Sequence, residues 1–358
     1  MDILIFDMDG VLLEAQGYHR ALLRTIQLIG EYLSLSNIKL SQEQIHTFES
    51  IGISSEWHSS ALCMAFLKIQ LVSGVTAPTL DLRELFTLIQ NQPLELPALE
   101  RGINAVRQIC VNRGIDPKEV VSSLTDCENI NQSLTMQWFQ ELVLGSEAYQ
   151  SFYEKPAQFN VQSYLRMYDQ PLLSSKNAER ISNWVDRNQG GVAIMTNRPS
   201  SGPTGFSGSP EAELGRDLVQ LSGIPIIGYG DISWLAESTQ SDAGTLVKPH
   251  ATHALAAIMS SLGLDNEISM KKAVTNALQW PQEISKKLHR GSITVFEDTT
   301  AGIISARNAV DVLRKAGIDV EFRAVGIAKD DTKKAALETQ GAQVFQDINT
   351  ALSSREDF

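Results

Sequence analysis

The chain has 358 residues, of which 43% are hydrophobic and 20% are charged. This length suffices for two compact units with separate cores, and the composition is ordinary for a globular protein. A net charge of −12 argues against a basic surface that binds nucleic acid. The three cysteines, Cys63, Cys110 and Cys127, are scattered, so we expect neither a disulfide framework nor a zinc site.

The apolar segments do not have the length of a membrane span. The first of them, residues 3–6, has only four residues before Asp7 interrupts it, which does not fit a secretory signal. The longest, residues 61–72, contains Lys68 and Gln70 and is too short to cross a bilayer. We therefore expect a cytoplasmic protein that acts without a membrane.

Short apolar runs typical of buried parallel strands occur along the chain at residues 3–6, 192–195, 224–228, 293–296, 323–327 and 343–345. Segments with helical periodicity lie between them, at residues 177–188, 211–223, 250–263 and 301–318. Strands that alternate with helices at this spacing predict an α/β fold, in which helices flank a Rossmann-like parallel sheet.

Residues 15–168 break this alternation, because they contain few strand-like runs. Helical patterns cover residues 18–33, 60–72, 82–90, 96–111 and 134–143. We therefore predict a mostly helical domain over residues 15–168, inserted into an α/β core that consists of residues 1–14 and 169–358. A smaller helical insertion is expected at about residues 265–290. The Gly-, Ser- and Pro-rich segment 199–210 is expected to be a mobile loop.

Two carboxylates follow the first strand-like run, in the sequence ILIFDMDG. Side chains at positions i and i+2 of a strand point the same way, so Asp7 and Asp9 can both reach the edge where open α/β sheets bind ligands. Two carboxylates about 4 Å apart repel by roughly 4 kcal/mol at an effective dielectric constant of 20, so a proton or a cation must offset the repulsion. An exposed turn with two acids of no special role is the alternative that this stretch leaves open.

A second acidic pair ends another strand-like run, in ITVFEDTTAG. If this strand lies beside the first, Glu297 and Asp298 bring the number of carboxylates in one small volume to three or four. Oxygen ligands in that number suit a hard divalent ion, Mg²⁺ above all. The two acidic pairs together predict a magnesium site.

Two further strand ends offer groups that suit phosphate. VAIMTNRP places Thr196 and Asn197 there, a hydroxyl and an amide that can hold phosphate oxygens without adding charge. LVKPH places Lys248 just ahead of a helix, whose amino end also favours anions. Taken singly, Thr196 could be a helix cap and Lys248 a surface residue. The order of these groups along the chain is what makes them informative.

This ordered set, DMDGVL, the threonine after VAIM, Lys-Pro and EDTTAG, resembles the four motifs of the haloacid dehalogenase-like (HAD) hydrolases. The resemblance covers the α/β core. The helical insertion directly after the first motif is similar to the cap domain of the subfamily that contains phosphoglycolate phosphatase and β-phosphoglucomutase.

The resemblance implies a Mg²⁺-dependent phosphoric monoester hydrolase. It gives Asp7 the role of nucleophile, with an aspartyl-phosphate intermediate, and Asp9 the role of general acid and base. The phosphate-binding residues would be Thr196, Asn197 and Lys248. The metal would be held by Asp7, the backbone carbonyl of Asp9, and Asp298, with Glu297 beside them.

We expect the substrate to be a small phosphorylated metabolite, with sugar phosphates among the candidates. Asp9 favours phosphoryl transfer over dehalogenation, because a halide leaving group needs no acid. A phosphomutase of the β-phosphoglucomutase type and a non-catalytic regulatory protein on the same fold remain as alternatives. GYGDIS, residues 228–233, lacks the third glycine of a dinucleotide fingerprint, so we expect no nicotinamide cofactor. The sequence does not indicate the oligomeric state.

Overall fold

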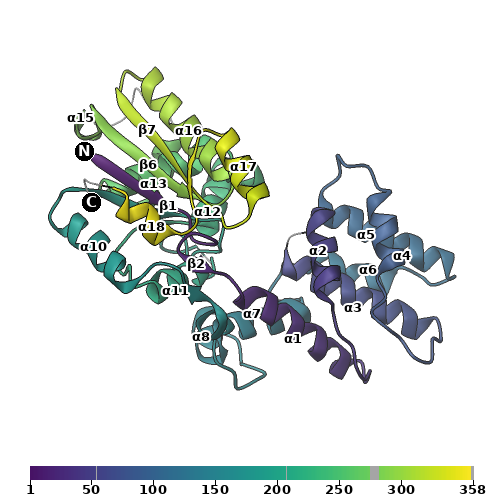
Figure 1. Cartoon of the computed structure of the whole chain (residues 1–358). Helices are drawn as coiled ribbons and strands as arrows, with labels where there is room; N and C mark the ends of the chain where they lie inside the picture. The colour runs from purple at the N-terminus through teal and green to yellow at the C-terminus, as the bar shows by residue number, and fades with distance from the viewer. Residues whose placement is uncertain (54, 207, 275–281, 356–358) are drawn as a thin grey trace. The chain divides into compact units, whose positions relative to one another are not determined.

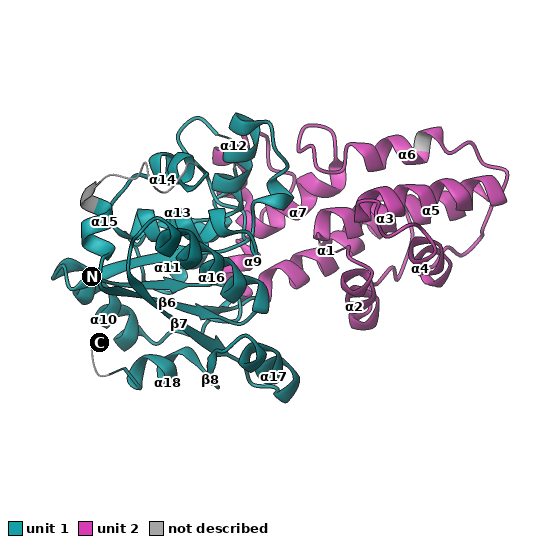
Figure 2. Cartoon of the chain, turned by 90° about the horizontal axis from the view of Figure 1, so that it is seen from above, with its two compact units in different colours: residues 1–15, 169–358 teal, residues 16–168 magenta. Residues whose placement is uncertain are grey.

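The structure, a computed structural model, describes residues 1–53, 55–206, 208–274 and 282–355. The chain divides into two compact units, coloured separately in Figure 2. The core unit consists of Met1–Ala15 and Asp169–Phe358, and the inserted unit consists of Gln16–Tyr168. The insertion therefore begins one residue later than the sequence analysis placed it. Each helix in the described residues is too short or too polar to cross a bilayer.

A six-stranded sheet lies at the centre of the core unit (Figure 1). Its strands are β1 Asp2–Phe6, β4 Gly190–Met195, β5 Ile226–Ile227, β6 Gly291–Glu297, β7 Val320–Ile327 and β8 Gln343–Phe345. All neighbouring strands run parallel, in the order β5-β4-β1-β6-β7-β8. Each apolar run that the sequence analysis identified as a strand contributes to this sheet. The predicted α/β fold is confirmed.

Helices connect the strands of the core unit. They are α10 Ser175–Asp186, α11 Glu211–Leu218, α12 Tyr229–Thr239, α13 Ala251–Ser261, α14 Asn266–Ala273, α15 Gln282–Leu288, α16 Thr300–Lys315, α17 Asp331–Thr339 and α18 Ile348–Ser353, with a 3-10 turn, η1, at Ala243–Thr245. The small insertion expected at about residues 265–290 contains α14 and α15, and its middle, residues 275–281, lies outside the described residues.

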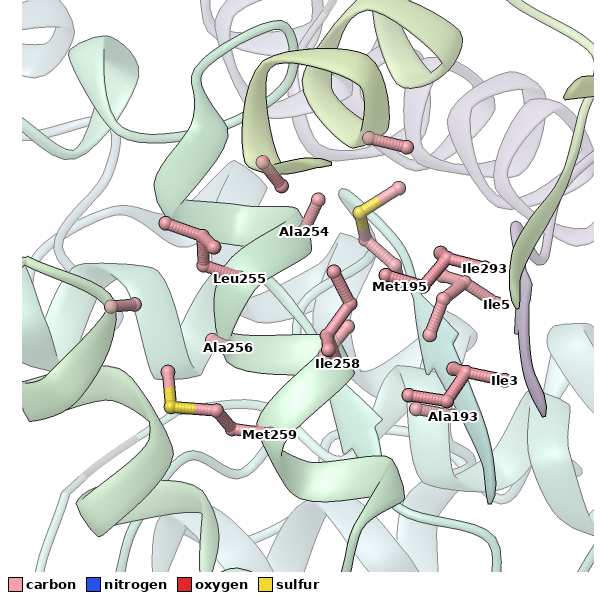
Figure 3. Close-up of a cluster of buried hydrophobic side chains, with 14 of the residues drawn as sticks. Ile3, Ile5, Ala193, Met195, Ala254, Leu255, Ala256, Ile258, Met259 and Ile293 are labelled. Carbon is pink, nitrogen blue, oxygen red and sulfur yellow. The ribbon is translucent and has the colours of Figure 1, made fainter. Parts of the chain in front are cut away.

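The sheet is buried on both faces, and β1 shows how. Ile3 and Ile5 point to the face covered by α12, α13, α14, α15 and α16, whereas Leu4 and Phe6 point to the face covered by α10, α11 and α18. In Figure 3 the side chains of α13 lie against those of β1 and β4 on the first of these faces. A strand buried on both sides must be apolar at every position, which is why the sequence of β1 is a continuous apolar run and not an alternating one.

A short ribbon that the sequence analysis did not predict lies where the chain leaves and re-enters the core unit. Strand β2, Leu13–Glu14, pairs antiparallel with β3, Gln170–Pro171. Each strand has only two residues, too few for a pattern of alternation to be recognised. The ribbon therefore holds the segment that precedes the insertion next to the segment that follows it.

The described residues of the inserted unit form helices joined by loops. The helices are α1 Gly17–Tyr32, α2 Gln42–Ser50, α3 Glu56–Val72, α4 Arg83–Gln90, α5 Ala98–Asn112, α6 Lys118–Thr125, α7 Leu134–Leu144, α8 Ser146–Tyr153 and α9 Tyr164–Tyr168. Helix α3 contacts α1, α5, α6 and α7, and its residues from Ser59 to Leu67 are all buried. A helix that is apolar on all sides belongs in the middle of such a unit.

Candidate active site

Three carboxylates gather at the carboxyl ends of the adjacent strands β1 and β6. Asp7 directly follows β1, Glu297 is the last residue of β6, and Asp298 comes next. The backbone N–H of Asp7 donates to the carbonyl of Phe296 at 2.9 Å, which fixes the two strand ends together. One oxygen from each of the three carboxylates lies within 4.8 Å of the others. Parallel pairing therefore brings together acids that are far apart in the sequence.

The ammonium of Lys248 is bound by two of these acids. Its Nζ atom donates to Oδ1 of Asp7 at 2.8 Å and to Oε1 of Glu297 at 2.7 Å. The side chain of Lys248 is 4% exposed, and that of Glu297 is fully buried. The second oxygen of Glu297 accepts a hydrogen bond from Thr299 Oγ1 at 3.1 Å. Glu297 is thus occupied on both oxygens.

Burial dominates the electrostatics of this group. It raises the pKa of Asp7 well above its usual value, the charges of Glu297 and Asp298 act in the same direction, and Lys248 opposes them. It also raises the pKa of Glu297, again against the effect of Lys248. Burial by itself would lower the pKa of Lys248, but the carboxylates of Asp7 and Glu297 outweigh it and the net pKa is raised. Lys248 is therefore a permanent positive charge beside Asp7.

Asp298 lies between a glycine and a lysine. Its Oδ2 atom forms an ion pair with Nζ of Lys333, in the first turn of α17. On the other side is Gly10, whose φ angle is +78° and where a Cβ atom would overlap the Asp298 carboxylate. The DMDG motif therefore has a glycine at this position because a side chain there would overlap Asp298. Lys333 was not predicted, because a lysine in KDDTKK has no distinguishing context.

The carboxylate of Asp9 is held by a different partner. Strand β1 ends at Phe6, so the alternation expected to align Asp9 with Asp7 does not extend to it. Nε of Arg198 instead donates to both oxygens of Asp9, at 2.7 and 2.9 Å. Nη2 of Arg198 donates to Oδ2 of Asp169 at 2.8 Å. Arg198 and Asp169 were not predicted, although Arg198 stands only two residues after Thr196.

The two remaining predicted residues follow β4. The N–H of Thr196 donates to the carbonyl of Ile227 at 3.0 Å, and its Oγ1 accepts from the N–H of Arg198 at 3.1 Å. Asn197 is exposed. Thr196 thus stabilises the local turn and faces the pocket described next; it is not the helix cap of the alternative interpretation, because the next helix, α11, begins only at Glu211.

All of the predicted residues except Glu297 line a pocket of the core unit with a volume of about 620 Å³. Its walls include Asp7, Asp9, Thr196, Asn197, Lys248 and Asp298. Glu297 lies behind them in the interior. On the side of β7 and α17, Lys329, Asp330 and Lys333 complete the wall. Acids, cations and neutral polar groups thus share one hollow at the carboxyl edge of the sheet, where α/β folds bind ligands.

Residues 199–210 form a loop after this site, and residue 207 lies outside the described residues. Hydrogen bonds hold this loop against neighbouring segments. Ser200 is fully buried, and its hydroxyl donates to Oδ2 of Asp231 at 2.8 Å. The N–H of Ala212 donates to the carbonyl of Pro199 at 2.8 Å. A Cβ at Gly230 would overlap the backbone of Ser200, so one glycine of GYGDIS makes room for this loop. The loop lacks regular structure as predicted, and these contacts fix both of its ends.

Comparison with solved structures finds a similar fold over nearly the whole chain. A crystal structure of a Northeast Structural Genomics Consortium target matches with a TM-score of 0.64 and 14% sequence identity, over 99% of this chain and 98% of that chain. The phosphatase Tt82 from Thermococcus thioreducens matches with a TM-score of 0.46 and 15% identity, over 94% of this chain and 99% of that chain. No family model and no curated protein matches the sequence. The first structure bears on the fold alone, and the second is too dissimilar to support an inference.

Proposed function

We propose that this protein is a Mg²⁺-dependent phosphatase that hydrolyses a small phosphorylated metabolite through an aspartyl-phosphate intermediate. The observation that supports this most directly is the buried carboxylate of Asp7, which faces the pocket between the ammonium of Lys248 and a second acid, Asp298. Phosphoryl transfer needs a nucleophile and positive charges that stabilise the phosphate oxygens, and it needs little further covalent chemistry. The pocket offers these groups together.

The donor set fits magnesium. The carboxylate oxygens of Asp7, Glu297 and Asp298 are hard ligands and lie close enough to share one ion. Asp7 and Asp298 face the pocket and would hold the ion, together with the backbone carbonyl of Asp9. Glu297 would support them from behind, because its own oxygens are bound by Lys248 and Thr299. When bound, the ion would neutralise negative charge that Asp7 and the phosphate share.

In the first step, an oxygen of Asp7 forms a bond to phosphorus while the bond between phosphorus and the leaving oxygen breaks. Asp9 gives its proton to that leaving oxygen. In the second step, the Asp9 carboxylate takes a proton from a water molecule, which attacks the aspartyl-phosphate and releases inorganic phosphate. Lys248, Thr196 and Asn197 bind the other phosphate oxygens, where positioning and charge stabilise the transition state.

A phosphate-release screen over a broad panel of phosphorylated metabolites tests this function. We expect release with Mg²⁺ and none after chelation, and the Asp7→Asn variant should lose at least about 1000-fold in rate. Asp186→Asn is the matched control, because Asp186 is an exposed residue at the end of α10, outside the residues that line the pocket. Full activity in Asp7→Asn, or release that chelation leaves unchanged, would contradict the proposal.

A further inference from the structure

Arg198 binds two carboxylates of the core unit that lie on either side of the insertion in the sequence. Asp9 precedes the insertion and Asp169 follows it. The guanidinium binds both oxygens of Asp9 through Nε and one oxygen of Asp169 through Nη2. The side chains of Arg198 and Asp169 are 1% and 0% exposed, whereas that of Asp9 is 39% exposed and lines the pocket. Arg198 and Asp169 thus lie in the interior, and Asp9 lines the pocket.

The position of the Asp9 carboxylate depends on this arginine. The residue lies in the turn that follows β1, just before Gly10 with its positive φ angle, and its backbone forms only an isolated bridge with Leu13 outside the six-stranded sheet. Within the described part of the chain, its carboxylate forms hydrogen bonds and ion pairs with Arg198 only. Without the arginine, the carboxylate would be free to rotate at the mouth of the pocket.

Asp169 in turn fixes the arginine. A buried guanidinium needs a buried counter-charge, and the planar fork of arginine can bind two carboxylates in a defined geometry. Asp169 immediately precedes β3, which pairs with β2 a few residues after Asp9. The arginine is therefore anchored to the ribbon where the chain re-enters the core unit, and Asp9 is anchored to the arginine.

We propose that Arg198 is a positioning residue for Asp9, and that Asp169 holds Arg198 in place. The inference rests on the proposed function, in which Asp9 gives a proton to the leaving oxygen. The carboxylate that remains after this transfer is the form that can accept both hydrogen bonds from Nε of Arg198. The arginine therefore orients Asp9 and stabilises the charge that develops on it as the phosphorus–oxygen bond breaks.

This role predicts selectivity between leaving groups. An alkyl alkoxide is strongly basic and needs a proton as it leaves, whereas a 4-nitrophenolate leaves readily without one. The ratio kcat/KM reports the steps up to release of the alcohol, so it does not depend on the later hydrolysis of the aspartyl-phosphate. Loss of general acid catalysis costs about 100- to 10,000-fold, and that loss should fall on the alkyl substrate.

The experiment measures kcat/KM for a small alkyl phosphate and for 4-nitrophenyl phosphate in Mg²⁺. We expect Arg198→Met to lower the alkyl value at least about 100-fold and the aryl value less than about 5-fold. Arg198→Lys keeps the charge but cannot form the fork, so its selectivity should be intermediate. Asp169→Asn should show the same selectivity with a smaller loss. Arg216→Met is the control, since Arg216 is a partly buried arginine of α11 that binds the carbonyl of Ile224 away from the pocket.

Equal losses on both substrates would show that Arg198 serves the fold alone and would overturn the inference. The same conclusion follows if Arg216→Met shows the same selectivity. If Arg198→Met does not fold, Arg198→Lys and Asp169→Asn provide the comparison. Failure of wild-type protein to hydrolyse either substrate would instead overturn the proposed function, and the inference with it.

Discussion

The carboxylate of Asp298 occupies the space beside Gly10, so that a Cβ atom at position 10 would overlap Oδ2 and Cγ of that acid. The two residues follow different strands, β1 and β6, and their contact depends on the parallel pairing between those strands. The φ angle of Gly10, +78°, is also one that other residues adopt only at a cost. Gly10 therefore meets a backbone requirement and a spatial one.

Replacement of Gly10 by alanine should separate these two requirements. The left-handed backbone alone should cost about 1–2 kcal/mol of unfolding free energy. The overlap should also displace Asp298, and we expect activity in Mg²⁺ to fall at least about 10-fold, since small displacements of catalytic groups cost about that much or more. Urea unfolding and phosphate release measure the two effects.

Gly317→Ala is the control for this prediction. The φ angle of Gly317 is +84°, and no atom lies within 4 Å of the added Cβ, so stability should fall without loss of activity. Equal activity losses in both variants would contradict this account.

The buried ion pairs of Lys248 predict a rescue of stability without a rescue of activity. Lys248→Met leaves Asp7 and Glu297 without their counter-charge, and breaking a buried pair in this way costs about 3–5 kcal/mol. Adding Glu297→Gln removes one of the two stranded charges, so the double variant should recover part of the unfolding free energy. Phosphate release should stay lost in both variants. A double variant that is less stable than Lys248→Met would show that Lys248 does not compensate Glu297.

The ion pair between Lys333 and Asp298 predicts competition with the metal. The ammonium and a bound divalent ion would share one carboxylate, so Lys333→Met should bind Mg²⁺ more tightly than wild type. The ion pair is partly exposed, and such pairs contribute up to about 1 kcal/mol, which corresponds to roughly a 5-fold lower Kd at most. Calorimetric titration with Mg²⁺ measures this change. Lys334→Met is the control, because Lys334 is exposed and pairs with Glu338 on its own helix. Weaker Mg²⁺ binding in Lys333→Met would refute the competition.

His253 predicts a dependence of stability on pH. Burial, together with the charge of Lys248, lowers its pKa to about 3, and its Nε2 atom donates to the carbonyl of Ile227 at 2.9 Å. The unfolded chain binds a proton at this residue near pH 6.5, whereas the folded protein does so only near pH 3. The stability contribution is therefore complete above about pH 6.5 and is lost as the pH falls toward 3.

From pH 7 to pH 5, wild type should lose about 2 kcal/mol more unfolding free energy than His253→Gln, in which the glutamine amide can still donate to Ile227. Urea unfolding at the two pH values gives the difference. The comparison between proteins cancels the effects of other titrating groups that the two share. Parallel losses in wild type and variant would show that His253 titrates alike in the folded and unfolded states.

Much of the core unit was predictable because its signals are local. A strand buried on both faces must be apolar throughout, so β1 and β6 appear in the sequence as continuous apolar runs, and acids placed directly after them stand out. The ribbon of β2 and β3 was not predictable, because two residues per strand carry no periodic pattern. In the inserted unit α1, α3, α4, α5 and α7 were identified, whereas α2, α6, α8 and α9 were not, since their sequences contain too few apolar residues at helical spacing.

For the site, the sequence by itself determined that Asp7 and Asp298 directly follow buried strands, because each stands beside a recognisable apolar run. Lys248 was expected at a strand end, but it lies in the loop between η1 and α13, because no strand precedes that loop directly. Only the tertiary structure decided the partners. Arg198 binds both Asp9 and Asp169, and Lys333 forms an ion pair with Asp298. An ion pair depends on the separation of two charges in space and on their burial, and neither quantity is written in the local sequence around an arginine or a lysine.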